Sequence, residues 1–253
     1  MKHSQNVFCI AAAVALLVAL MSLSARAAED KEGLVAGYNF DEGTGAVAKD
    51  SSGNGLDATI NAAKYVKHDA GFALEFDGDT AYVVAPQSPL LNAWGKPGKS
   101  YSVEAWFKSK GKEDPSLIEK ESPGDHPSYP FVIRGPGPKG LMVFAAFDVD
   151  SGKNPATVAS NVAWADDQWH QVVGVRDSAG EKFLLYVDGK VRNTKSDDVA
   201  QIDVSNSGPV TIGSRFAETC TTGFQGQIDN VFLFDRALSA DEIKARYEKM
   251  ATK

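Results

Sequence analysis

Cysteine is scarce in this chain of 253 residues, which contains only Cys9 and Cys220. Cys9 lies near the start of an apolar N-terminal run, too early to follow that run as a lipid-attached cysteine would. If the run is removed, Cys220 has no partner, so a disulfide framework is excluded and the hydrophobic core must hold the fold. Cys220 stands in a Thr-rich stretch, where a small structural residue is a better interpretation than a catalytic thiol.

A concentration of positive charge is also missing. The chain has a net charge of −7, and its Lys and Arg residues form no block. Because binding to a phosphate backbone needs clustered Lys and Arg, the sequence predicts no nucleic-acid partner.

Long apolar runs are absent after residue 27, so the sequence predicts no membrane span there. Before it, Lys2 precedes an apolar run at 7–21, and small residues follow at 22–28. We expect 1–27 to be a cleaved secretory signal, which makes the protein secreted or periplasmic. A retained anchor is the weaker alternative, because the run is shorter than the roughly 20 residues of a spanning helix. Cleavage removes Lys2 and Arg26 and changes the net charge from −7 to −9.

Helical periodicity is missing from residue 33 almost to the C-terminus, and alternation with a period of two replaces it. The clearest hairpin is FLLYVDGKV at 183–191, because Asp-Gly tolerates the positive φ angles of a tight turn. The pattern predicts an all-β fold, a two-sheet antiparallel β-sandwich. The other expected strands lie near 34–40, 74–76, 82–84, 102–107, 131–133, 141–147, 169–175, 210–212 and 228–234.

At the C-terminus the alternation with a period of two gives way to a helical pattern. Ser239 and Glu242 form a capping box, and Leu238 and Ile243 are placed for a hydrophobic staple. A short helix is therefore predicted against the sandwich, with Lys244, Arg246 and Lys249 toward solvent. Since no linker interrupts the pattern, we expect one domain at 33–250.

Three stretches in this order resemble the laminin-G-like jelly-roll family of concanavalin A-like proteins. The resemblance covers nearly the whole chain after the predicted signal, and it implies the sandwich, a structural calcium ion and recognition of carbohydrate in many members. The stretches are YNFDEGTG with DSSGNG and LEFDG at 38–78, YSVEAWF with WHQVV and LYVDG at 101–189, and GQIDNVFLFDRALS at 226–239.

The loop at 50–55 has the oxygen-bearing side chains and glycines of a calcium site. The residue types alone favour an ordinary Asx-type turn. In similar proteins, however, this loop meets the acid of the terminal Gly-x-Ile-Asp stretch. The resemblance therefore implies that Asp50, Asn54 and Asp229 hold calcium in a structural role.

Catalytic signals are weak. His170 is better explained by packing or a hydrogen bond than by catalysis, and no Gly-x-Ser-x-Gly motif occurs. Glu119 and Glu121 have the even spacing that a glycosidase pair on one strand needs, but the Glu-x-Asp-x-Glu pattern of similar glucanases is missing. We therefore predict no catalytic residues and no enzyme.

The remaining candidates for ligand binding are Trp94 and Tyr129, which lie in loop-like stretches and are expected to be exposed. Aromatic rings there can stack on sugars, or simply cap the end of the sandwich. The sequence thus predicts a secreted, non-catalytic module that binds carbohydrate or a glycan-bearing surface. A protein-interaction or surface-structural domain of the same fold, and a polysaccharide-active hydrolase or lyase, remain alternatives.

Overall fold

A computed structural model describes residues 31–111, 115–121, 128–136, 139–148, 156–198, 200–215 and 222–251. Contacts divide the chain into two compact units, 1–33 and 34–253, and the second contains all the strands described below. The predicted signal segment and Cys220 lie outside the described residues. No helix within the described ranges is long and apolar enough to cross a membrane.

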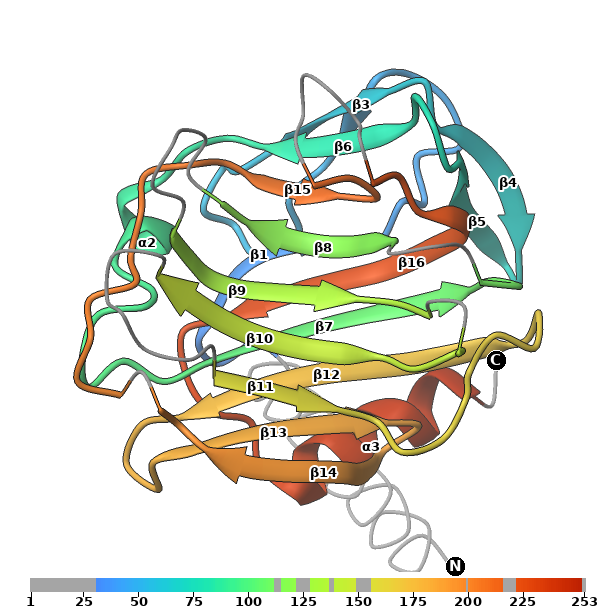
Figure 1. Ribbon diagram of the computed structural model, residues 1–253. Coiled ribbons are helices and arrows are strands. Elements are labelled where there is room, and N and C mark those ends of the chain that lie inside the picture. Colours follow the sequence, from blue (N-terminus) through green and yellow to red (C-terminus); the bar gives the residue numbers. More distant parts are fainter. Residues whose placement is uncertain are drawn as a thin grey trace, which may run out of the picture. The chain divides into compact units, whose positions relative to one another are not determined.

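The larger unit is a sandwich of two antiparallel sheets, as the sequence predicts (Figure 1). In sheet A the last strand pairs with the first, so segments from the two ends of the domain are direct neighbours. This pairing is the one that the family resemblance requires. The strands of sheet A, in spatial order, are β14 (Lys190–Ser196), β13 (Lys182–Val187), β12 (Trp169–Asp177), β7 (Tyr101–Lys108), β16 (Gln225–Phe234), β5 (Gly71–Asp77) and β4 (Lys64–His68), with β1 (Leu34–Tyr38) also paired to β16.

Sheet B lies across the core from sheet A (Figure 1). Several of its strands are too short to show a period of two in the sequence, and β2, β3, β8 and β11 were not predicted for this reason. The strands of sheet B, in spatial order, are β11 (Ala156–Ala159), β10 (Val143–Asp148), β9 (Ser128–Arg134), β8 (Ser116–Lys120), β15 (Val210–Ile212), β6 (Tyr82–Ala85), β3 (Ala58–Asn61) and β2 (Val47–Ala48).

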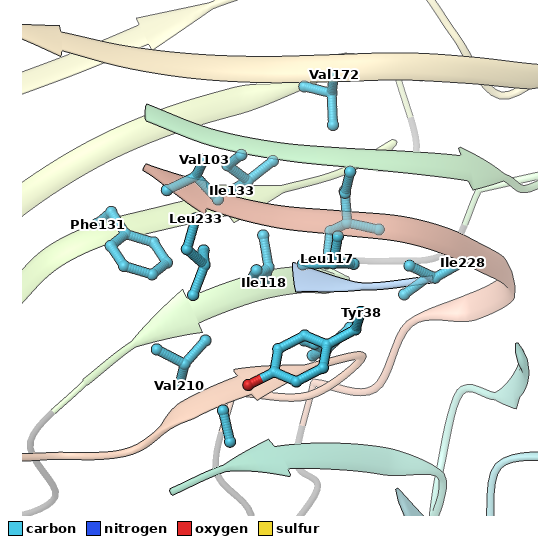
Figure 2. Close-up of a cluster of buried hydrophobic side chains, with 14 of the residues drawn as sticks. Tyr38, Val103, Leu117, Ile118, Phe131, Ile133, Val172, Val210, Ile228 and Leu233 are labelled. Atoms are coloured by element: carbon cyan, nitrogen blue, oxygen red, sulfur yellow. The ribbon is translucent and has the colours of Figure 1, made fainter. Parts of the chain in front are cut away.

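The core fills the space between the sheets with alternate side chains of their strands. Val103 and Leu233 come from sheet A, Ile118 and Ile133 come from sheet B, and all four are fully buried in one cluster (Figure 2). Each such side chain contributes roughly 1.5–3 kcal/mol through removal from water. The core can therefore hold the fold without a disulfide.

The predicted hairpin is confirmed. β13 and β14 pair through a turn at Asp188 and Gly189, whose φ angles are 52° and 67°. Positive φ at both central residues matches the twist of the two strands, and Asp-Gly adopts it at little cost.

The C-terminal helix is confirmed as α3 (Ala240–Ala251). The Ser239 amide donates to Glu242 Oε2 at 2.8 Å, and the Glu242 amide donates to Ser239 Oγ at 3.2 Å, so the capping box forms. Leu238 and Ile243 are buried together. A second helix, α2 (Pro89–Asn92), is a single turn capped by Ser88, which is too short to leave a period in the sequence.

Arg246 corrects one detail of the predicted helix. Its side chain does not point to solvent but donates from Nε to Glu104 Oε2 at 2.5 Å, and the Glu104 side chain is 1% exposed. Beside this pair, the Tyr247 ring stacks on Trp106 with centroids 5.7 Å apart. The helix is thus fixed to sheet A by a buried ion pair and a ring stack as well as by its apolar face.

Candidate functional site

The face of sheet B that points away from the core carries buried charged side chains. Glu119 and Glu121 come from the end of β8, Tyr129 and Arg134 from β9, and Arg215 from the segment that follows β15. We call these five residues the Glu–Arg cluster. Charged groups rarely lose contact with water unless a partner or a function explains it, so this face is the candidate site.

A β-bulge places Tyr129 in the cluster. Val132 of β9 pairs with Ala145 of β10, and Tyr129 of β9 pairs with Phe147 of β10. Between these two pairs β9 advances by three residues and β10 by only two. The extra residue turns Tyr129 to the face of Val132 and away from Phe131, which points into the core. A strict period of two would have put Tyr129 in the core.

Glu121 and Arg215 form a two-point ion pair. Arg215 donates from Nε and Nη2 to the two carboxylate oxygens of Glu121, at 3.0 and 3.1 Å. Arg215 Nη2 also donates to the Tyr129 hydroxyl at 2.8 Å. The Tyr129 ring stacks on Phe147 with centroids 5.8 Å apart. This geometry fixes the guanidinium plane and the phenol together.

Glu119 and Arg134 form a looser pair beside the first. Arg134 Nη2 lies 3.7 Å from Glu119 Oε2, which also accepts a hydrogen bond from Ser116 Oγ at 2.8 Å. The other oxygen, Oε1, is buried and has no hydrogen-bond partner among the described residues. Burial raises the pKa of Glu119 to about 8 against the lowering effect of Arg134.

The two ion pairs have the same orientation. The side chains of Glu119 and Glu121 are 0% and 1% exposed, whereas those of Arg134 and Arg215 are 27% and 29% exposed. The carboxyl groups therefore lie beneath, and the arginine side chains reach the surface of the sheet.

The predicted exposure of Trp94 and Tyr129 is wrong. Trp94 is 3% exposed and lies in the core, where its ring stacks on Tyr101 with centroids 5.2 Å apart. It presents no face for a sugar in this arrangement. Tyr129 is 8% exposed, but its hydroxyl belongs to the Glu–Arg cluster. A role of either residue in ligand binding stays a prediction.

The loop of Asp50 is held by hydrogen bonds. Asp50 Oδ1 accepts from the Gly37 and Ser52 amides, and Oδ2 accepts from Ser52 Oγ and the Leu56 amide, all at 2.7–3.0 Å. Burial alone would raise the pKa of Asp50, but these bonds lower it overall. Asn54 Nδ2 donates to the Val35 carbonyl at 2.9 Å, so both predicted ligands tie the loop to β1.

Asp229 has different partners. Its Oδ2 lies 2.8 Å from His68 Nδ1, and its Oδ1 accepts from the Asn230 amide. It shares no hydrogen-bonding partner with Asp50 or Asn54, and the carboxylate of Asp50 is already filled by donors. No group of three or more His, Cys, Asp and Glu in the described ranges is arranged for a metal. Calcium binding stays a prediction.

The model of a laminin-G-type family, described as the concanavalin A-like lectin/glucanases superfamily, matches residues 77–244. The chain belongs to this superfamily. The match includes β7 to β16 and all five residues of the Glu–Arg cluster, and the resemblance seen in the sequence is confirmed. No curated protein matches the sequence.

Solved structures share the concanavalin A-like fold at low sequence identity. The binding domain of Paraclostridial Mosquitocidal Protein 1 has a TM-score of 0.69 at 12% identity, over 87% of this chain and 53% of its own. Botulinum neurotoxin type C depends on two ganglioside molecules for cell entry. Its structure has a TM-score of 0.67 at 12% identity, over 88% of this chain and 52% of its own. The binding domain of botulinum neurotoxin DC in complex with SialylT has a TM-score of 0.65 at 14% identity, over 87% of this chain and 52% of its own.

This concanavalin A-like chain spans about half the length of those structures. At these identities the likeness establishes the fold, and the first and third of these structures are binding domains. The superfamily description itself names both lectins and glucanases, so the fold alone does not separate binding from catalysis.

Proposed function

We propose that the protein is an exported, non-catalytic module that binds carbohydrate through the Glu–Arg cluster. The observation that carries the proposal is the bulge that turns Tyr129 out of the core and onto Arg215, whose two-point pair with Glu121 fixes its direction. Bulges often re-aim one side chain at a functional site, and a fixed set of polar groups is what orients a sugar.

The chemistry of the cluster suits hydroxyl-rich ligands. Guanidinium groups donate, carboxylates accept, and the Tyr129 hydroxyl can do both. Because the ion pairs already hold these groups in place, a sugar would meet them without a large ordering cost. Two of the similar proteins support the same class of ligand, because one depends on gangliosides for cell entry and the other is in complex with SialylT. Export rests on the sequence pattern of residues 1–27 alone.

The test is binding of the full chain to a panel of immobilised glycans, with Tyr129→Phe as the variant. Loss of the hydroxyl removes the Arg215 contact and should weaken glycan binding about fivefold. Tyr82→Phe is the matched control, because Tyr82 is a half-buried tyrosine on β6 of the same sheet. A folded wild-type protein that binds no glycan would contradict the proposal and favour a protein partner.

A polysaccharide hydrolase is the second candidate, and one observation favours it. Burial raises the pKa of Glu119 to about 8, and Glu121 lies two residues further on and is paired with Arg215. One protonated and one ionised carboxyl group are the pair that glycoside hydrolysis uses. Turnover of a polysaccharide that disappears in Glu119→Gln would establish this function, whereas binding without turnover supports the module.

A further inference from the structure

We propose that the Glu–Arg cluster selects carbohydrates that carry a carboxylate over neutral ones. The proposal rests on the proposed function and adds the class of ligand. Its basis is the shared orientation of the two ion pairs, in which both arginine side chains lie above the acids that hold them.

The surface of the cluster is cationic because of this layering. Arg134 and Arg215 are each more than a quarter exposed, while the carboxyl groups of Glu119 and Glu121 have almost no contact with solvent. An approaching ligand therefore meets guanidinium groups and the Tyr129 hydroxyl before any carboxylate. Guanidinium is the side chain that best matches the planar shape of a carboxylate.

The charge of the cluster also supports a preference for carboxylates. Glu121 is matched by Arg215. Burial raises the pKa of Glu119 to about 8, against the lowering effect of Arg134. The guanidinium groups that reach the surface of the cluster thus stand on a chain whose net charge is −7. A local reversal of sign on an acidic protein favours an anion at that position.

Glu119 adds an independent sign of a ligand. Its side chain is fully buried, and Oε1 has no hydrogen-bond partner among the described residues. Unpartnered buried polar atoms are uncommon and need an explanation. A sugar hydroxyl beside a bound carboxylate would supply the missing partner.

The test compares two ligands that differ only in charge: alginate oligosaccharides and the same oligosaccharides after reduction of the carboxyl groups. Sialyllactose and lactose form a second pair, and dextran sulfate tests whether any anion suffices. Binding to the full chain is measured by calorimetry at physiological salt. We expect the carboxylated member of at least one pair to bind about tenfold tighter than its neutral form.

Arg134→Gln should weaken binding of the carboxylated member more than binding of the neutral member, and so reduce the ratio of the two affinities from about tenfold toward one. Its cost to folding is small, because Glu119 can stay protonated. Arg215→Lys keeps the charge near Glu121 but loses the two-point geometry, and should weaken carboxylate binding as well. Lys195→Gln is the matched control, because it removes one positive charge from exposed β14 of sheet A. Thermal unfolding confirms that each variant is folded.

Equal binding of both members of each pair would overturn the selectivity and leave glycan binding intact. Equal loss in Lys195→Gln and Arg134→Gln, or equally tight binding of dextran sulfate, would reduce the effect to general charge attraction and also overturn it. Binding to no glycan at all would remove the proposed function together with this inference.

Discussion

The imidazole of His68 stacks on the indole of Trp169, with ring centroids 3.9 Å apart and an angle of 21° between the planes. His68 ends β4 and Trp169 begins β12, and these strands are four places apart in sheet A. The contact is therefore made across the outer surface of the sheet rather than between neighbouring strands. His68 is held there by its 2.8 Å contact with Asp229 on β16.

This stack should contribute measurably to stability. Trp169→Ala and His68→Ala are each expected to lower the free energy of unfolding, with a coupling of about 0.5–1.5 kcal/mol between them in a double-mutant cycle, as for other ring pairs. Urea unfolding of the two single variants and the double variant gives the coupling. Additive losses would show that the rings are adjacent but not energetically coupled.

His170 should make stability depend on pH. Its Nδ1 lies 2.9 Å from Asp188 and its Nε2 3.0 Å from Asp166. Burial lowers the pKa of His170, but the two carboxylates outweigh it and raise the pKa above its ordinary value of 6.5. The imidazolium therefore stabilises the fold fully below pH 6.5, and this contribution is lost as pH rises through the folded-state pKa.

The measurement is an NMR titration of the His170 ring in the wild type and in Asp166→Asn. Asp166 is exposed, so the variant should fold normally with a lower pKa at His170. Thermal unfolding of His170→Gln should differ most from the wild type at acidic pH. An unchanged pKa in Asp166→Asn would contradict the assigned role of that carboxylate.

Lys120 should act in the opposite direction. It is 1% exposed, and its Nζ donates to Asn92 Oδ1 at 3.2 Å and to the Gly208 carbonyl. Burial lowers the pKa of Lys120 from 10.5 to about 8. The unfolded chain holds the proton more tightly, so this residue should increase stability as pH rises from about 8 toward 10.5.

Comparison with Lys120→Met isolates the effect, because the variant keeps the length of the side chain without the charge. The difference in the free energy of unfolding between wild type and variant should change across this pH range in favour of the wild type. A constant difference would mean that Lys120 is protonated throughout.

Asp50→Asn should destabilise the protein even in chelator. The amide group of asparagine would face one of the four donors that the carboxylate now accepts, at a cost of roughly 1–3 kcal/mol. Asp79→Asn, an exposed acid after β5, is the control. Thermal unfolding is measured with and without calcium. Unchanged stability of the variant in chelator would contradict the role of these hydrogen bonds, and stabilisation by calcium of the wild type alone would identify Asp50 as a ligand.

Much of the fold could be predicted because its signals are local. The Asp188-Gly189 turn and the Ser239–Glu242 capping box each depend on a few neighbouring residues, and both form as expected. The pairing of β1 with β16 came from the family resemblance instead. Short strands such as β2 and β11 left too little alternation to be found.

The site was harder to predict because it depends on distant contacts. Glu121 and Arg215 are separated by 94 positions, and nothing in either neighbourhood indicates the pair. The face of Tyr129 is set by a bulge, which appears in the sequence only as Pro130 within the strand. Trp94 was expected outside because its neighbours are polar and small, yet Tyr101 and Phe131 enclose it.

The position of β16 has a consequence for how the domain assembles. This strand separates β7, β5 and β1 from one another, so sheet A is three unjoined pieces until residues 225–234 are inserted between them. Up to that moment each piece exposes a row of unpaired amides and carbonyls that could recruit another chain. Completion of the fold and protection from aggregation are therefore the same event, and it depends on one late-synthesised segment.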